Sequence, residues 1–263
     1  GWEVTKNSFE TQFSNNLQDG VTIQLDENID PIRFGLNPMP AWFFGEGFSP
    51  MPYLEEPATE AISVGANVIR YPVNTNAEID YVVTSDGVKQ NLNIRDMPFA
   101  PDGFEGHFGL QETMIIPSGY ALFIEDSMIE EGGKLTTTNS SIDVRNLETG
   151  ELLVTIGRPL IYDQSNFNGE SPDGHLGLYV IRSYGEVIEI ATVVDTDWLL
   201  SEERVYPVQI DPTINQGTQR SGYAYYYRTT GWWSSTYERA YSTNNIYSIG
   251  TCRGYRSVQS CTT

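Results

Sequence analysis

The sequence predicts an all-β protein: an antiparallel β-sandwich body with one short helix, followed by a small tyrosine-rich β tail. Apolar and polar residues alternate in short runs, as in half-buried strands, and few windows show the 3.6-residue period of a helix. The 24 Gly and 14 Pro are spread along all 263 residues and divide the chain into short segments. Short turns between consecutive strands favour antiparallel pairing, and two such sheets bury a common core.

The first part of the chain contains two alternating segments, 2–5 and 21–25, which predict half-buried strands separated by turns. Residues 36–60 differ, because they hold five Pro and show no alternation, and we expect an extended loop there. The aromatic side chains of this loop either fill the core or offer a contact surface to another subunit. The candidates for such a surface are Trp42, Phe43 and Phe44.

Strand signals are clearest in the middle of the chain. Residues 79–84 and 88–94 flank an Asp-Gly turn and form the strongest predicted hairpin. Two further hairpins are expected within 142–156 and within 176–194, each around a short turn that contains Gly. Consecutive strands joined in this way predict antiparallel sheets.

Residues 193–214 connect the predicted body to the tail. Asp195 or Thr196 is expected to cap a short helix at 197–203. The alternating strand that follows contains Pro207, which has no N–H to donate to a neighbouring strand. This strand is therefore expected either to lie at a sheet edge or to start at the proline.

The segment RVYPVQIDPTI at 204–214 resembles the signature RVYPV-x-IDPT, which closes a β-rich module in large secreted and cell-surface proteins. These include wall-associated and Rhs-type proteins, in which the signature commonly precedes a DNRLRE domain. Upstream, 67–71, 77–83 and 86–90 resemble the IRY and DLxYxVxxDGVKE parts of the same module. The resemblance covers roughly residues 65–214, and it implies an exported surface module with no known catalytic residues. The tail lacks the DNRLRE pattern, so the resemblance implies nothing about its fold.

The tail, residues 215–263, has a different composition from the body, residues 1–214. It holds eight of the 16 Tyr and five Arg, with Glu238 as its single acidic residue and no Lys, which gives a net charge of +4. The whole chain carries −20, so −24 remains on the body. Interleaved Tyr and Arg are typical of interfaces. The expected interface residues of the tail are Tyr225, Tyr227, Arg228, Trp232, Trp233, Tyr237 and Arg239.

The overall charge of −20 argues against nucleic acid as a partner, because phosphate binding requires an excess of Lys and Arg. It fits a protein that stays soluble in a saline exterior or that attracts divalent cations. No run of 18 apolar residues is present, so no membrane span is predicted.

Two cysteines, Cys252 and Cys261, lie nine positions apart in the tail. An even number of cysteines in an exported chain favours an intrachain disulfide, which would stabilise the tail by about 2–3 kcal/mol. Intermolecular disulfides and two free thiols are the alternatives that the spacing leaves open.

Known catalytic patterns are absent from the sequence. His107 and His175 are the only imidazoles, and neither has a second ligand at metal-binding spacing. There is no GxSxG motif, no Cys–His pair and no P-loop. Pairs of neighbouring acids arise by chance among 35 carboxylates, and a glycosidase needs two of them about 5–10 Å apart in a cleft. We therefore predict that the protein is not an enzyme.

Two weaker site signals lie in the body. The polar loop at 163–173 is rich in oxygen ligands for Ca²⁺, although it does not match an EF-hand loop and also reads as a plain polar turn. Its candidate ligands are Asp163, Asn166, Asn168 and Asp173. Asn139 begins an Asn-Ser-Ser glycosylation sequon, which has meaning only in a glycosylating cell. No other cofactor is predicted.

The function predicted from these features is that of an extracellular structural protein. We expect the chain to self-assemble into a cell-surface layer, sheath or filament, with the Tyr/Arg tail of one copy packed on the acidic body of the next. The alternatives are an adhesin whose tail aromatics bind cell-wall glycan, a shell segment of a larger Rhs-type protein and, least favoured, a hydrolase.

Overall fold

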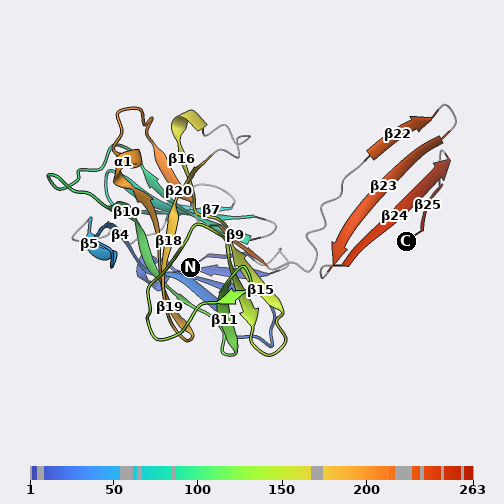
Figure 1. The fold of residues 1–263 in the computed structure, drawn as a ribbon, viewed down its shortest axis with the longest axis horizontal. Helices are drawn as coiled ribbons and strands as arrows, with labels where there is room; N and C mark the ends of the chain where they lie inside the picture. Colours follow the sequence, from blue (N-terminus) through green and yellow to red (C-terminus); the bar gives the residue numbers. More distant parts are fainter. Residues whose placement is uncertain are drawn as a thin grey trace. The chain divides into compact units, whose positions relative to one another are not determined.

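The computed structural model divides into two compact units, Gly1–Gln216 and Gly217–Thr263, called the body and the tail below. Strands form 58% of the chain and pair into antiparallel sheets, which confirms the predicted all-β fold class (Figure 1). Side chains are described only within the body, between residues 9 and 215. The structure describes residues 2–4, 9–53, 62–63, 67–84, 87–166, 174–211, 213–216, 227–231, 234–243, 246–255 and 258–262.

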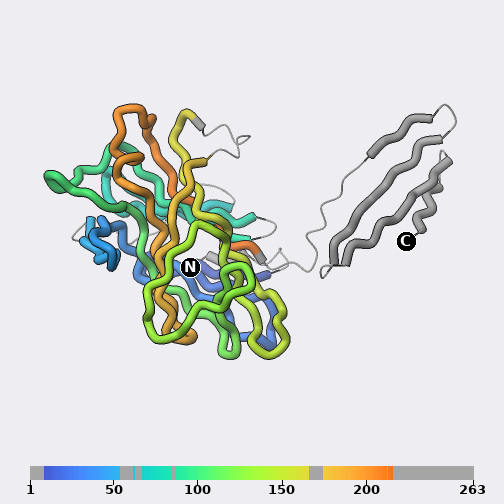
Figure 2. The backbone as a smooth tube through the Cα atoms, in the orientation of Figure 1, coloured from blue at the N-terminus to red at the C-terminus, as the bar shows by residue number. Residues whose placement is uncertain are grey.

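The first sheet of the body has nine strands in the order β1-β2-β3-β4-β10-β19-β18-β13, with β5 paired to β4. Strands β4, β10 and β19 are far apart in the sequence but lie side by side, as the backbone trace in Figure 2 shows. The bounds of the strands are β1 Trp2–Val4, β2 Glu10–Phe13, β3 Val21–Gln24, β4 Ile32–Phe44, β5 Ser49–Pro52, β10 His107–Ile115, β13 Thr136–Thr138, β18 Leu178–Tyr184 and β19 Val187–Asp195.

The second sheet has twelve strands, nine of them in the order β12-β11-β14-β15-β21-β9-β20-β16-β17. The other three extend from β9 through β8 and β7 to β6, while β20 and β21 pair with successive parts of β9. The bounds are β6 Ile62–Ser63, β7 Val68–Pro72, β8 Ala77–Val83, β9 Gly87–Ile94, β11 Tyr120–Ile124, β12 Ser127–Met128, β14 Ile142–Asn146, β15 Leu152–Ile156, β16 Leu160–Asp163, β17 His175–Leu176, β20 Val208–Asp211 and β21 Thr213–Gln216.

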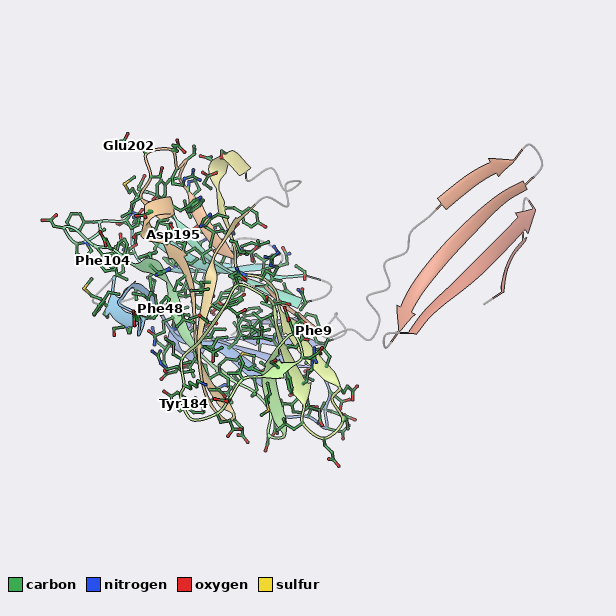
Figure 3. All side chains as sticks on the ribbon, in the orientation of Figure 1. Phe9, Phe48, Phe104, Tyr184, Asp195 and Glu202 are labelled. Carbon is green, nitrogen blue, oxygen red and sulfur yellow. The ribbon has the colours of Figure 1, made fainter. Side chains whose placement is uncertain are left out.

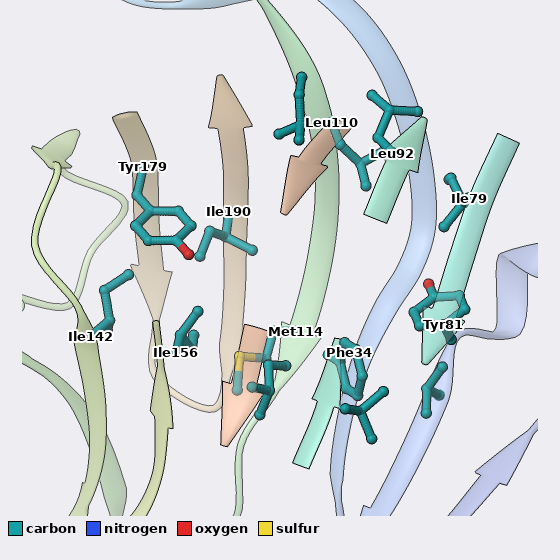
Figure 4. Packing of buried hydrophobic residues seen from close by; sticks show 14 of the residues in the cluster. Phe34, Ile79, Tyr81, Leu92, Leu110, Met114, Ile142, Ile156, Tyr179 and Ile190 are labelled. Carbon is teal, nitrogen blue, oxygen red and sulfur yellow. The ribbon is translucent and has the colours of Figure 1, made fainter. Parts of the chain in front are cut away.

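The two sheets of the body bury a common hydrophobic core, part of which is drawn in Figure 4. Alternation along β3 decides which of its residues enter the core, so that Val21 and Ile23 are buried while Thr22 and Gln24 are not. Tyr81 of the second sheet is fully buried, and its ring centroid lies 6.0 Å from Phe13 and 5.9 Å from Phe34 of the first sheet. Such contacts between facing sheets make the body a β-sandwich.

The expected loop at 36–60 is largely strand in its described part, because β4 and β5 occupy most of it. The two prolines of β4, Pro38 and Pro40, lie where one edge of the strand has no paired neighbour among the described strands. Pairing with β3 ends at Phe34, and pairing with β5 begins at Ala41. Proline is tolerated at such a free edge. Register shifts between β4 and β10 interrupt the alternation of buried residues and hide the strand in the sequence.

The helix that precedes the signature segment is shorter than predicted. Helix α1 spans Thr196–Leu199, and its N-cap is Asp195, whose Oδ1 accepts the Trp198 N–H at 2.8 Å. The remainder of the expected helix, up to 203, forms turns. Pro207 directly precedes β20, which lies between β9 and β16, so this strand starts at the proline and is not at an edge. No helix in the described part of the chain is long and apolar enough to cross a membrane.

The tail contains its own antiparallel sheet in the order β22-β23-β24-β25. Each strand pairs with the next one along the chain, and β22 and β25 each have a single neighbour among the described strands. The bounds are β22 Tyr227–Gly231, β23 Ser234–Thr243, β24 Ile246–Tyr255 and β25 Val258–Thr262.

Candidate functional site

The residues that resemble the surface-module signature form a set of internal contacts. Arg204 Nη1 lies 3.1 Å from Asp163 Oδ2, and the Arg204 guanidinium lies 4.5 Å from the Trp198 ring centroid. The hydroxyl of Tyr206 donates to the carbonyl of Leu199 at 2.7 Å. Arg204 therefore connects the start of the signature to β16, and Tyr206 connects it to α1.

The second half of the signature lies in the second sheet. Val208 and Ile210 of β20 are fully buried in the core. Asp211 accepts from Lys89 Nζ and from Thr213 Oγ1, both at 2.9 Å. Since Lys89 belongs to β9, this ion pair ties the end of the signature to the predicted DGVK strand. The second half of the motif thus forms part of the second sheet and of the common core.

The upstream residues of the resemblance belong to the same sheet. Arg70 of β7 makes two hydrogen bonds of 2.7 Å to the Asp80 carboxylate of β8, and these bonds raise the pKa of Arg70. Glu78 accepts from Arg70 at 3.0 Å and from Arg95 at 2.5 Å. Asn93 donates to Asp80 at 3.1 Å. These carboxylates are buried and each faces a cation, so the network stabilises the sheet and presents no uncompensated charge.

The two histidines both lie near the Asp195 carboxylate, a grouping that the sequence did not reveal. His175 Nε2 lies 3.0 Å from Asp195 Oδ2, and the His175 ring stacks on Trp198 at a centroid distance of 4.6 Å. His107 of β10 stands opposite Asp195 in the register of β10 with β19. Burial lowers the pKa of His107, and the Asp195 carboxylate acts in the opposite direction. The ring of Phe48 lies 5.0 Å from His107.

The His175–Asp195 pair has the geometry of a base and its orienting carboxylate, but the rest of a catalytic site is not built around it. In the part of the chain that the structure describes, no hydroxyl or thiol is found hydrogen-bonded to His175. The second oxygen of Asp195 is used to cap α1. The rings of His175 and Trp198 stack, and the Arg204 guanidinium lies over the same indole, at the end of the sandwich that Asp195 marks in Figure 3.

The predicted calcium loop is only partly within the described residues. Asp163 is buried and accepts from the hydroxyl and the amide of Ser165 at 2.5 and 3.1 Å, in addition to its ion pair with Arg204. A guanidinium at this position competes with a bound cation, so Asp163 is a poor calcium ligand. Asn166 ends a 3-10 turn, while Asn168 and Asp173 lie outside the described residues. Within those residues no three acidic, His or Cys side chains group as a metal site.

A half-buried acid lies between the two sheets. Gln90 of β9 donates to Glu112 of β10 at 2.5 Å and to the Tyr81 hydroxyl at 3.0 Å. Burial raises the pKa of Glu112 to about 7, against the hydrogen bonds from Gln90 and from the Gly35 backbone. Gly35 has a φ of +63°, and a Cβ there would lie 2.2 Å from the Tyr81 hydroxyl, so this position requires glycine.

The structure separates the predicted interface residues into two groups. Trp42 and Phe43 are each 2% exposed, which removes them from any contact surface, whereas Phe44 is 48% exposed. Trp42 faces the main core and Phe43 the opposite side of the first sheet. Their burial follows from the strand that replaces the expected loop. Asn139 is exposed in a bend before β14.

The predicted tail residues are placed by backbone register alone. Arg228 stands opposite Tyr237 between β22 and β23, and Tyr237 stands opposite Cys252 between β23 and β24. Tyr227 and Arg239 also lie in these strands. Cys252 is directly opposite Cys261 between β24 and β25. The other tail residues predicted at an interface lie outside the described residues, and they are Tyr225, Trp232 and Trp233.

No family model, curated protein or solved structure matches this chain. The resemblance of 204–214 to the surface-module signature therefore stays a prediction. In this fold these residues make contacts within the body, to β16, β9 and the core.

Proposed function

We propose that this protein is a non-enzymatic, extracellular structural subunit that self-assembles into a cell-surface layer, sheath or filament. The observation that carries the proposal is the combination of a self-contained acidic sandwich with a separate tail sheet of opposite charge. A tail that binds the body of another copy makes a head-to-tail contact, and such contacts generate open polymers unless the rotation closes a ring.

The charge difference supports this direction of packing. The tail has five Arg and one acidic residue, whereas the remainder of the chain carries a net charge of −24. Opposite charges steer the encounter of two copies and disfavour contacts between two bodies or two tails.

The strand order of the tail supports the same proposal. Strands β22 and β25 each leave one edge without a described neighbour, and unpaired edges are sites at which further strands add. The register of Cys252 with Cys261 favours an intrachain disulfide that holds β25 on β24. A disulfide of this kind would keep the tail sheet intact outside the cell.

The test is the assembly state of the full chain by electron microscopy and sedimentation. We expect ordered sheets or filaments at about 0.1 M salt and their weakening at about 1 M, where the Debye length falls to about 3 Å. Replacing either Arg228 or Arg239 by Glu should reduce assembly, and replacing the exposed body residue Arg158 by Glu serves as the charge-matched control.

Reductant and a Ca²⁺ chelator should be added in parallel, because they separate disulfide-linked and ion-linked assemblies from those held by side-chain contacts. Monomers in every condition would reject the proposal. Binding of such monomers to cell-wall glycan, lost on Trp233→Ala, would then favour the adhesin instead.

A further inference from the structure

The tip of the β18–β19 hairpin exposes an apolar pair on the outer face of the first sheet. Tyr184 and Val187 stand opposite each other in the register and are 50% and 42% exposed. Ile115 of β10 follows Val187 in the same row and is partly exposed. Figure 3 shows Tyr184 at the end of the body away from Asp195. An aromatic residue exposed beside aliphatic neighbours is typical of an interaction surface.

The Tyr184 ring is held in place by the backbone beneath it. A Cβ at Gly133 would lie 2.4 Å from the ring, and Gly133 has a φ of +75°, so only glycine fits there. The amides of Gly132 and Gly133 donate to the Ser183 carbonyl at 3.0 and 2.9 Å, which fixes this loop against β18. A ring fixed in this way loses little side-chain entropy when a partner binds.

The charges around Tyr184 favour a cationic partner. Glu131 Oε2 lies 3.9 Å from where a Cβ would stand on Gly185, and Glu186 is exposed at the hairpin turn. Neither carboxylate has an ion-pair partner within the described residues, whereas Glu130 is paired with Lys134 at 2.9 Å. Two carboxylates at or near the hairpin turn therefore have no ion-pair partner among the described residues.

The cations nearest along the sheet do not cancel these carboxylates. Arg182 donates to the Gly47 carbonyl at 2.7 Å and stands opposite Glu189 in the register. Arg33 is opposite Ile115 on β4, three strands away from β18. The surface at the hairpin tip thus combines one fixed aromatic ring with net negative charge.

We propose that the Tyr184–Val187 surface is the docking point for the Arg/Tyr-rich tail of a second copy of this chain. An arginine of the incoming tail stacks on the Tyr184 ring and forms ion pairs with Glu131 and Glu186. Five Arg against one acidic residue make the tail the complementary part of this chain. The inference rests on the proposed function, since it names the body surface that the tail would meet.

The test places a benzophenone photo-crosslinking amino acid at position 184 in the full chain and mixes ¹⁵N-labelled with unlabelled protein. We expect crosslinks between a labelled and an unlabelled chain, with the second end in residues 217–263, identified by mass spectrometry. Crosslinks to the body of another copy, or assemblies without crosslinks at position 184, would overturn the inference and leave the proposed function standing. If the wild-type chain forms no assemblies, the proposed function fails and the inference fails with it.

Substitutions provide a second measurement. Tyr184→Ala, and separately the pair Glu131→Gln and Glu186→Gln, should weaken assembly tenfold or more, whereas Tyr184→Phe should retain it. Phe99→Ala is the matched control, because Phe99 is 81% exposed on the loop between β9 and β10. Equal loss of assembly in Tyr184→Ala and Phe99→Ala would contradict a specific docking point at the hairpin tip.

Discussion

The body and the tail are both antiparallel β structures, but the body has two sheets that bury a common core and the tail has one sheet in its described part. In the body two sheets face each other and share a core. Tyr81, for example, contacts Phe13 and Phe34 of the first sheet and Tyr71 of the second. The tail is a single sheet within its described residues, with two edges that lack a neighbour. A sandwich is stable through its own core, while a lone sheet gains stability from a partner. This difference is why the proposed assembly places the association in the tail.

The two units also differ in the sign of their net charge. The carboxylates of the second sheet are paired internally, as with Asp80 and Arg70 or Asp211 and Lys89. The tail has too few acidic residues to pair its own arginines. These pairs stabilise the sheet, but the rest of the chain still carries a net charge of −24 against +4 on the tail, so both units keep an excess of one sign and the two excesses are opposite.

The largest expected effect is on the core of the body. Trp42→Ala should lower the free energy of unfolding by about 4 kcal/mol, because the indole is 2% exposed and packs on Tyr53, Phe104 and Phe108. Denaturant unfolding measures the loss. Phe44→Ala, at an exposed neighbouring position, should change it by less than about 1 kcal/mol. A loss of unfolding free energy below about 1 kcal/mol in both variants would restore the interpretation of this segment as a surface loop.

Next in size is the ion pair that anchors the signature. Arg204→Ala should destabilise the body by about 3 kcal/mol, because it leaves the buried Asp163 carboxylate without its cation and removes the stack on Trp198. Lys134→Ala breaks an exposed pair with Glu130 and should have an effect below about 1 kcal/mol. Thermal unfolding of the two variants compares them. Equal shifts of the melting temperature in the two variants would mean that the burial of Asp163 does not increase the cost of losing its cation.

The Arg204–Asp163 contact also predicts that the stability of the body falls at low pH. Burial alone would raise the pKa of Asp163, but hydrogen bonds from Ser165 and Val205 and the charge of Arg204 lower it overall. A lowered carboxyl pKa contributes stability above its unfolded value of 3.8, and this contribution is lost as the pH falls through the folded pKa. Asp163→Asn should flatten this acid limb of the stability curve.

A third effect concerns the acid between the sheets and has the opposite sign. Glu112 titrates near 7 in the folded body and near 4.5 when unfolded, so the folded state holds the proton more tightly. Stability should therefore fall as the pH rises from about 4.5 to about 7, by at most about 3 kcal/mol. Chemical unfolding at a series of pH values measures it, and Glu112→Gln should remove this dependence. A wild-type curve that is flat over this range would contradict the raised pKa.

The smallest effect belongs to the tail. If Cys252 and Cys261 form a disulfide, replacing both by Ser should destabilise the tail sheet by about 2–3 kcal/mol. Hydrogen exchange of β23–β25 should increase, while the exchange of the body strands stays the same. Non-reducing peptide mapping checks the bond directly. Two free thiols in the purified chain would remove the disulfide from the proposal.

Local pattern was sufficient wherever neighbouring segments pair with each other. The hairpin of β8 and β9 is formed as the Asp-Gly turn predicts, with Val83 opposite Val88. The cap of α1 by Asp195 and the strand start at Pro207 were also predictable, since both depend on the chemistry of one or two residues. The fold class follows from many such local preferences that agree.

The sites depended on contacts that the sequence does not encode locally. His175 and His107 come from β17 and β10, and only the pairing of β10 with β19 brings His107 opposite Asp195. Arg204 and Asp163 are 41 positions apart, and their ion pair requires the α1 segment to fold back on β16. Long-range pairing of this kind has no local sequence signal.

By itself, the sequence determined the all-β class, the hairpins and the division of charge between body and tail, because alternation, turn residues and composition act over a few positions. Only the tertiary structure decided that Trp42 lies in the core, that Glu112 meets Gln90 of the facing sheet and that the exposed Tyr184 ring lies against the backbone of Gly133. Each of these environments is created by strands distant in the sequence. Burial, and with it the pKa and the availability of a side chain, is a property of the packed sheets and not of the residue.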